Sequence, residues 1–327
     1  MQAGIKHWLV VSFKRITVLH VGGSCLRTKG VNPGCFAIAG GVFLRGVFME
    51  TKTEILLEGL VFPEGPRWHA GRLWFSDMDA GRVMTVDLEG RAETVAYVPG
   101  RPSGLGWLPD GRLLVVSMTD RRLLRLEPDG LVEAADLSKL ASCHLNDMVV
   151  DVRGRAYVGN FGFELGAGEP FSPAEIILVT PDGNACIVAD RMAFPNGSVI
   201  TADGSTLIVA ETFGACLTAF DIEMDGSLSG RRIWARLERA VPDGICLDAE
   251  GAVWVASPLS AEVLRVFEGG RVTHRIRVST QAYACMLGGP ERRTLFVLTS
   301  GDRSPGTGMS GGCIEMVECD VPGAGLP

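Results

Sequence analysis

Four side chains with oxygen donors occupy equivalent positions in a phrase that recurs along the chain. Asp243, Asn196 and Asn146 each stand eight residues before a turn-forming glycine, and Glu64 stands seven residues before one. No lysine or arginine occupies the equivalent position, which we call one phase of the repeat. Carboxylates and amide carbonyls gathered at this phase would repel one another without a cation. Two carboxylates and two neutral oxygens suit one hard divalent cation, Ca²⁺ first, with Zn²⁺, Mg²⁺ and Mn²⁺ as alternatives.

Each of these positions precedes a segment whose pattern predicts a strand, a tight turn and a second strand. The turn glycines are followed by apolar, β-rich runs, and the successive glycines are 40, 43, 50 and 47 residues apart: Gly71, Gly111, Gly154, Gly204 and Gly251. A sixth, degenerate copy has Glu291-Arg292-Arg293 as its turn. This period is that of a four-stranded unit, and Asp-Gly pairs in several copies predict a further hairpin.

Six four-stranded units predict an all-β chain folded as a six-bladed β-propeller, because radial repetition protects the sheet edges. The apolar segment Glu54–Val61 precedes the first copy and is expected to complete the last blade. No linker divides the repeats, so we predict one propeller domain over residues 49–327. The alternative is a pair of β-sandwiches, which the regular period disfavours.

The propeller geometry predicts where the four oxygen-bearing side chains meet. The innermost strand of each blade runs along the central channel, so the phase that holds Glu64, Asn146, Asn196 and Asp243 should surround one mouth of a metal-binding channel. Ser103 occupies this phase in a fifth copy, and the sixth position falls near Ala284. Taken singly, Glu64, Asn196 or Asp243 before a glycine is ordinary turn chemistry. Only the phased set indicates a site.

Composition excludes several classes of function. The net charge of −7 gives no basic surface for nucleic acid or for an anionic membrane, so a small molecule is the expected partner. Nine cysteines without a C-x-x-C pair predict reduced, structural thiols in a cytoplasmic protein. Nothing in the sequence determines the oligomeric state.

Residues 1–48 differ from the rest of the chain, with six basic side chains and no acidic one. Their apolar stretches are too short for a secretory signal or a membrane span. A transit peptide is one interpretation of such a segment. We prefer another, that translation starts at Met49 and that residues 1–48 are an atypical extension outside the fold.

The ordered phrases resemble one protein family over about residues 54–301. The residues that carry the resemblance are Phe62-Pro63-Glu64-Gly65-Pro66-Arg67-Trp68, Asn146-Asp147, Pro195-Asn196-Gly197 and the run from Pro242-Asp243-Gly244 to Glu250-Gly251. Together they are similar to the SMP-30/gluconolactonase/luciferin-regenerating-enzyme family. The resemblance implies a six-bladed propeller with one divalent cation in its channel that hydrolyses lactones of sugar acids.

The resemblance also implies roles for individual residues. Glu64, Asn196 and Asp243 match the family's metal ligands, and Asp243 matches its proton donor and acceptor. Asn146 corresponds to a residue that bridges metal and substrate. His144 stands where the family has a substrate-binding arginine, and Glu164 corresponds to a substrate-contacting glutamate. The histidine departs from the family pattern and puts the sugar-lactone substrate in question, although an ordinary loop histidine explains it equally well.

Two other functions fit the same pattern. A metal-dependent phosphotriesterase would share the ligands and differ in the walls of the pocket. A non-catalytic propeller scaffold would bind partners on its faces, but it would have no reason to place two carboxylates and two asparagines at one phase. A metal-dependent lactonase is therefore our principal hypothesis.

Overall fold

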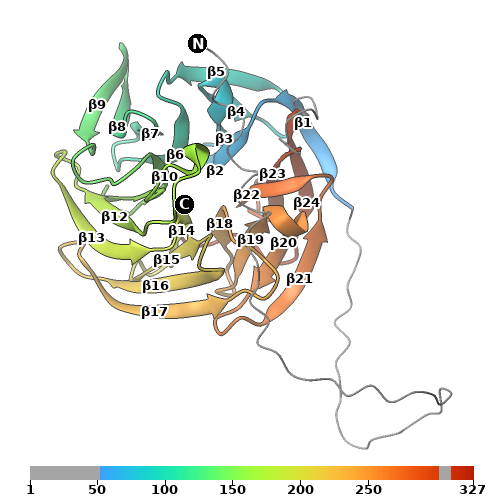
Figure 1. Ribbon diagram of the computed structural model, residues 1–327. Helices are drawn as coiled ribbons and strands as arrows, with labels where there is room; N and C mark the ends of the chain where they lie inside the picture. Colours follow the sequence, from blue (N-terminus) through green and yellow to red (C-terminus); the bar gives the residue numbers. More distant parts are fainter. Residues whose placement is uncertain (1–51, 302–310) are drawn as a thin grey trace, which may run out of the picture.

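The computed structural model describes residues 52–301 and 311–327, and it arranges them as six four-stranded antiparallel sheets around a central axis (Figure 1). This is the predicted six-bladed β-propeller. The atypical extension at residues 1–48 lies outside the described residues.

The blades follow one another along the chain, each running from an inner to an outer strand. Blade 1 holds β2 (Pro63–His69), β3 (Arg72–Asp77), β4 (Arg82–Val86) and β5 (Ala92–Tyr97), and blade 2 holds β6 (Pro102–Trp107), β7 (Leu113–Ser117), β8 (Arg122–Glu127) and β9 (Gly130–Asp136). Blade 3 holds β10 (Leu145–Val150), β11 (Ala156–Asn160), β12 (Ala174–Val179) and β13 (Ala185–Met192), and blade 4 holds β14 (Pro195–Ile200), β15 (Thr206–Glu211), β16 (Cys216–Ile222) and β17 (Leu228–Arg236). Blade 5 holds β18 (Ile245–Leu247), β19 (Val253–Ser257), β20 (Glu262–Val266) and β21 (Val272–Arg277), and blade 6 holds β22 (Gln281–Gly288), β23 (Thr294–Ser300), β24 (Gly312–Glu318) and β1 (Glu54–Leu60). Three short 3₁₀ helices complete the elements: η1 (Met78–Ala80), η2 (Leu165–Ala167) and η3 (Pro258–Ser260).

The ring closes as the sequence predicts, because the first strand completes the last blade. β1 pairs antiparallel with β24 and forms the outer edge of blade 6 (Figure 1). A buried apolar cluster continues this closure, since Leu73 of blade 1, Phe296 of blade 6 and Trp254 of blade 5 belong to it. The first and last described strands are therefore held together by hydrogen bonds and by apolar packing.

The turn after the inner strand of blade 5 follows from local side-chain chemistry. In blade 5 the Asp248 carboxylate accepts hydrogen bonds from the backbone N–H groups of Glu250 and Ala252, and Gly251 supplies the positive φ of 75°. The degenerate turn of blade 6 has the same backbone form, with Arg292 at a φ of 55°. The predicted repeat thus continues through blade 6 although its turn lacks the glycine.

The glycine after the predicted site position allows neighbouring blades to approach closely. A Cβ on Gly197 would lie 2.6 Å from the backbone nitrogen of Ile245, and a Cβ on Gly244 would lie 2.6 Å from the Cα of Ala284. Both glycines have ordinary backbone angles, so they are required for close packing and not for turn formation. Gly65 and Gly104 meet the next inner strand in the same way.

A buried polar side chain at the end of the second strand anchors the loop that enters the inner strand. In blade 1, Asp77 accepts hydrogen bonds from the N–H groups of Val61 and Phe62, at 3.0 and 2.9 Å. In blade 4 the Glu211 carboxylate accepts one from Ala193, and in blade 5 the Ser257 hydroxyl accepts one from Val241. These contacts fix the loops that lead to the predicted site positions.

The far end of the channel is crossed by the chain near its C-terminus, which lies at the centre of the ring in Figure 1. Leu326 exchanges two backbone hydrogen bonds with Ile200, the last residue of β14. Ala324 donates another to Leu247, the last residue of β18. The predicted site lies at the opposite ends of these inner strands.

Two further features concern the predicted setting of the protein. The described residues include seven cysteines, and all seven carry free thiols, as expected of structural cysteines. Among residues 52–301 and 311–327, no helix has the length and apolar character needed to cross a membrane.

Substitution Asp77→Ala is expected to lower the free energy of unfolding by about 3 kcal/mol, because it removes a fully buried acceptor of two loop hydrogen bonds and the partner of Arg82. Urea unfolding of both proteins measures the difference. Asp110→Ala, which removes an exposed partner of Arg112, is the control and should cost less than about 1 kcal/mol. Equal effects of the two substitutions would contradict the anchoring role of Asp77.

Candidate active site in the central channel

The structure brings five of the six predicted site residues to one cavity at the mouth of the channel. The cavity is lined by Glu64, His144, Asn146, Asn196 and Asp243. Glu64, Asn146 and Asn196 are each the second residue of an inner strand, whereas Asp243 lies two residues before β18 begins. The sixth predicted residue, Glu164, lies beside His144 and does not line the cavity itself.

The two acids of this set lie in a confined environment. Asp243 is buried, and its Oδ1 atom has no hydrogen-bond partner in the described structure. Glu64 is half-buried, and one of its carboxylate oxygens accepts a hydrogen bond of 3.2 Å from the N–H of Gly65. An unpartnered buried carboxylate oxygen is costly, so Asp243 Oδ1 marks a position where a ligand would be stabilising.

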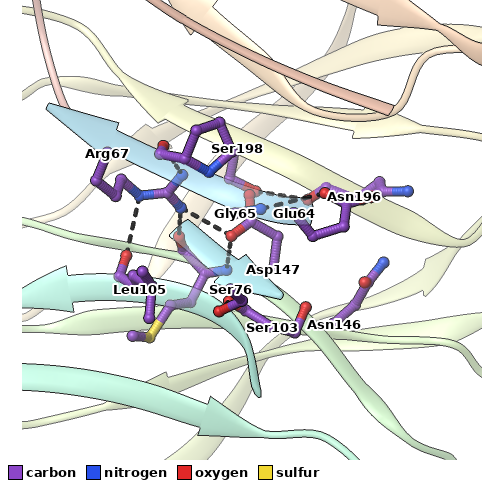
Figure 2. Close-up of polar contacts among 12 residues, drawn as sticks. Glu64, Gly65, Arg67, Ser76, Ser103, Leu105, Asn146, Asp147, Asn196 and Ser198 are labelled. Carbon is purple, nitrogen blue, oxygen red and sulfur yellow. Dashed lines mark hydrogen bonds and ion pairs between the residues drawn. The ribbon is translucent and has the colours of Figure 1, made fainter. Parts of the chain in front are cut away.

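A third acid beneath the cavity is paired with the arginine of the first phrase. Figure 2 shows the Arg67 guanidinium reaching from β2 to the Leu105 carbonyl on β6 and to Asp147 on β10, at 2.9 and 2.7 Å. Arg67 therefore fastens three inner strands together. If all three acids are ionised, this one guanidinium leaves two negative charges on Glu64, Asp147 and Asp243 uncompensated.

Burial and like charge shift the ionisation of these acids in one direction. Burial raises the pKa of the Glu64 carboxyl to about 8, and the neighbouring Asp147 adds to the rise. Burial, followed by the charges of Glu64 and Asp147, raises the pKa of Asp243 well above its usual range. Burial also raises the pKa of Asp147, although Arg67 opposes this. In the absence of a cation, the site therefore favours protonated carboxyl groups.

Hydrogen bonds orient the two amide side chains. Asn146 donates through Nδ2 to the Pro195 carbonyl at 3.0 Å, which leaves its Oδ1 atom as the group available to a ligand. Asn196 donates to the Thr212 hydroxyl at 3.3 Å, and Thr212 in turn donates to the Pro242 carbonyl at 2.8 Å. This chain joins Asn196 to the loop that carries Asp243.

At the rim of the cavity, a cysteine, a histidine and a glutamate form a small cluster. The ligand atoms of Cys143, His144 and Glu164 all lie within 4.8 Å of one another, and His144 Nε2 is 3.6 Å from a Glu164 carboxylate oxygen. Burial lowers the pKa of His144, although Glu164 opposes the change, and burial raises the pKa of the Cys143 thiol. His144 therefore favours its neutral form at neutral pH.

Several cavity residues were missed by the sequence reasoning, although the repeat phase contains a signal for most of them. The position two residues before the predicted site position supplies Phe62, Arg101 and Phe194 as well as His144. The first residue after the second strand of a blade supplies four others: Met78, Met118, Phe161 and Thr212. Blade 6 contributes Tyr283, one residue before the expected position at Ala284.

Residues 62–301 match the family model described as the SMP-30/gluconolactonase/LRE-like region. The chain therefore belongs to this family, as its ordered motifs predicted. The match begins at the first repeat and ends after β23.

Individual relatives agree with this assignment. A pentonolactonase of Haloferax volcanii is 26% identical over 80% of this chain and 89% of its own length. A 6-deoxy-6-sulfogluconolactonase of Pseudomonas putida is 23% identical over 85% of this chain and 98% of its own. The structure of a calcium-binding regucalcin from Agrobacterium tumefaciens has a TM-score of 0.73 at 21% identity, and the match covers 85% of this chain and 97% of that one.

The stability of the metal-free protein is expected to fall as the pH rises from 4.5 to about 8. Glu64 is protonated in both the folded and unfolded states at lower pH, so its contribution is then fully present. Between these values the unfolded chain releases the proton while the folded chain retains it, and the contribution is lost. Melting temperatures measured across this range in a chelator test the expectation.

Substitution Glu64→Gln should make this pH dependence shallower, because the amide cannot ionise. Glu58→Gln, at an exposed position on β1, is the control and should retain the wild-type dependence. A Glu64→Gln profile that coincides with the wild-type profile would contradict the ionisation behaviour described for Glu64.

Proposed function

We propose that this protein is a divalent-metal-dependent hydrolase that opens a sugar-acid lactone or a related lactone. The observation that supports this most strongly is the convergence of Glu64, Asn146, Asn196 and Asp243 on one buried cavity. Relatives of similar length are named as lactonases. The free thiols of the described residues support a cytoplasmic setting.

The residues present fit a divalent cation. Glu64, Asn196 and Asp243 would hold it, and together they offer two carboxylates and one amide oxygen, the donor types that Ca²⁺ prefers. The unpartnered Oδ1 atom of Asp243 supports this assignment, as do the two uncompensated negative charges of the acid cluster. Ca²⁺ is the first choice, and a related protein is described as calcium-binding. Zn²⁺, Mg²⁺ and Mn²⁺ are alternatives.

The reaction needs one proton carrier and one polarising group. A divalent cation in this site would polarise the lactone carbonyl and acidify water. Asp243 takes one proton from the attacking water, whose oxygen forms the new bond to the carbonyl carbon. The ring C–O bond then breaks, and Asp243 returns the proton to the leaving alkoxide oxygen. The confined cavity strengthens each of these polar interactions.

In this proposal Asn146 and His144 contact the substrate, and Glu164 acts through His144. Asn146, held by its hydrogen bond to Pro195, presents Oδ1 beside the ligand-binding acids. His144 lines the cavity, and Glu164 lies 3.6 Å from the His144 ring nitrogen. Glu164 therefore positions His144, which offers a donor or an acceptor to the substrate according to its tautomer.

Substitution Asp243→Asn is expected to lower kcat by at least about 100-fold, because an amide cannot carry the proton. Glu64→Ala should weaken cation affinity by at least about tenfold, because it removes one of two charged ligands. Lactone hydrolysis followed in a pH-stat measures kcat of Asp243→Asn. Calorimetric titration with Ca²⁺, Mn²⁺ and Zn²⁺ measures the cation affinity of Glu64→Ala. Asp182→Asn, at an exposed hairpin, is the control and should match the wild type. Unchanged affinity in Glu64→Ala and full activity in Asp243→Asn would show that the assigned residues are wrong.

Substitution His144→Arg is expected to lower KM for a sugar lactone by an amount equivalent to at most about 1.5–3 kcal/mol, with a smaller change in kcat. An arginine supplies several donors in a fixed fork, whereas a neutral histidine supplies one. Steady-state kinetics test this against His274→Arg, an exposed position on β21. If His144→Arg and His144→Ala both leave KM unchanged, His144 has no role in substrate binding.

A further inference from the structure

The cavity above the acids is walled mainly by apolar side chains, and these come from four different blades. Six of them line the same cavity as Asp243: Phe62, Met78, Met118, Phe161, Phe194 and Phe213. Phe161 also packs against a buried cluster formed by Phe62, Met78, Met118 and Tyr283. Leu165 of η2 adds a further apolar side chain at the rim.

Three of the aromatic rings form a continuous wall on the side of blades 3 and 4. The ring centroids of Phe161 and Phe194 are 4.7 Å apart, and those of Phe194 and Phe213 are 5.2 Å apart. Phe194, between the other two rings, is buried, whereas Phe161 and Phe213 are only partly buried and retain more accessible surface. A ligand in the cavity therefore meets aromatic carbon on this side.

Three polar side chains of the wall are already engaged in contacts within the protein. Arg101 is paired with the Asp79 carboxylate, and the Tyr283 hydroxyl donates to the Gln281 side chain at 2.6 Å. Thr212 donates to a backbone carbonyl and accepts from Asn196. Each hydroxyl of a polyhydroxylated ligand would lose its hydrogen bonds to water on entering this cavity. To replace them at this wall, the hydroxyl would have to displace contacts that these side chains already make, which is unfavourable.

We propose that the substrate is a lactone whose ring carries an apolar alkyl or aryl substituent, and that this substituent lies against Phe161, Phe194 and Phe213. The proposal rests on the lactonase function proposed above and narrows its substrate class. The lactone ring lies at the acids, where the polar groups are, and the substituent extends along the aromatic wall. Apolar surface on both partners is removed from water in this arrangement. The substrate class thus differs from the sugar lactones in the names of the relatives.

A series of γ-lactones with straight alkyl side chains of one to seven carbons tests the proposal with the metal-loaded wild-type protein. The value of kcat/KM is expected to rise about fourfold for each methylene until the wall is covered. Ribonolactone, which carries hydroxyl groups on the same ring, should be a poorer substrate than the alkyl lactones. A flat series, or a preference for ribonolactone, would overturn the proposal.

Substitution Phe213→Ser tests the position of the substituent. It should reduce the gain to about twofold or less for each methylene, because it removes part of the accessible wall. Tyr97→Ser is the control, since Tyr97 is 70% exposed on the outer strand β5 and lies outside the cavity lining. The control should retain the wild-type series. An unchanged series in Phe213→Ser would overturn the assigned position.

Binding of alkyl-substituted γ-lactams, which resist hydrolysis, gives a second measurement that needs no catalysis and no variant. Calorimetry with the metal-loaded wild-type protein should show affinity that increases with chain length. The two proposals can then fail separately. Lactam binding that increases with chain length, without hydrolysis of any lactone, would refute the lactonase function and retain the apolar site. Rapid hydrolysis of ribonolactone without a gain from alkyl chains would retain the lactonase and refute the substrate class.

Discussion

The main electrostatic constraint on this structure is the repulsion between carboxylates gathered at the centre of the ring. Glu64 and Asp243 share one cavity with Asp147 beneath it, and Arg67 compensates only one of the three potential negative charges. Burial and mutual repulsion therefore raise the pKa values of Glu64 and Asp243. A fold selected for stability alone would replace such groups, and their presence is a reason for the proposal that a cation binds here.

The propeller holds these acids in place through contacts between blades. Glycines such as Gly197 and Gly244 let neighbouring inner strands approach until a single Cβ would collide with the next backbone. Arg67 then ties β2, β6 and β10 together, and Asp77 fixes the loop before β2. The site residues are consequently placed by rigid strand ends and short anchored loops, which suits a preorganised polar site.

The sequence predicted the fold and the convergence of the site because a repeat places equivalent residues in equivalent surroundings. Glu64, Asn146, Asn196 and Asp243 share one phase, and that phase meets at the axis. The pairing of Arg67 with Asp147 could not be predicted, because these residues lie on different blades and repeat phase does not report contacts between blades. The apolar wall was missed because Phe161 and Phe213 follow second strands, a phase that the chemical argument had not considered.

The most direct test of this account is lactone hydrolysis by the full chain before and after its metal is removed with a chelator and restored. Bound metal is counted in the same samples. The account predicts that the stripped protein loses its activity and recovers it when one divalent cation is bound for each chain. Full activity in a stripped protein that contains no bound metal would contradict the claim that the buried acids hold a catalytic cation.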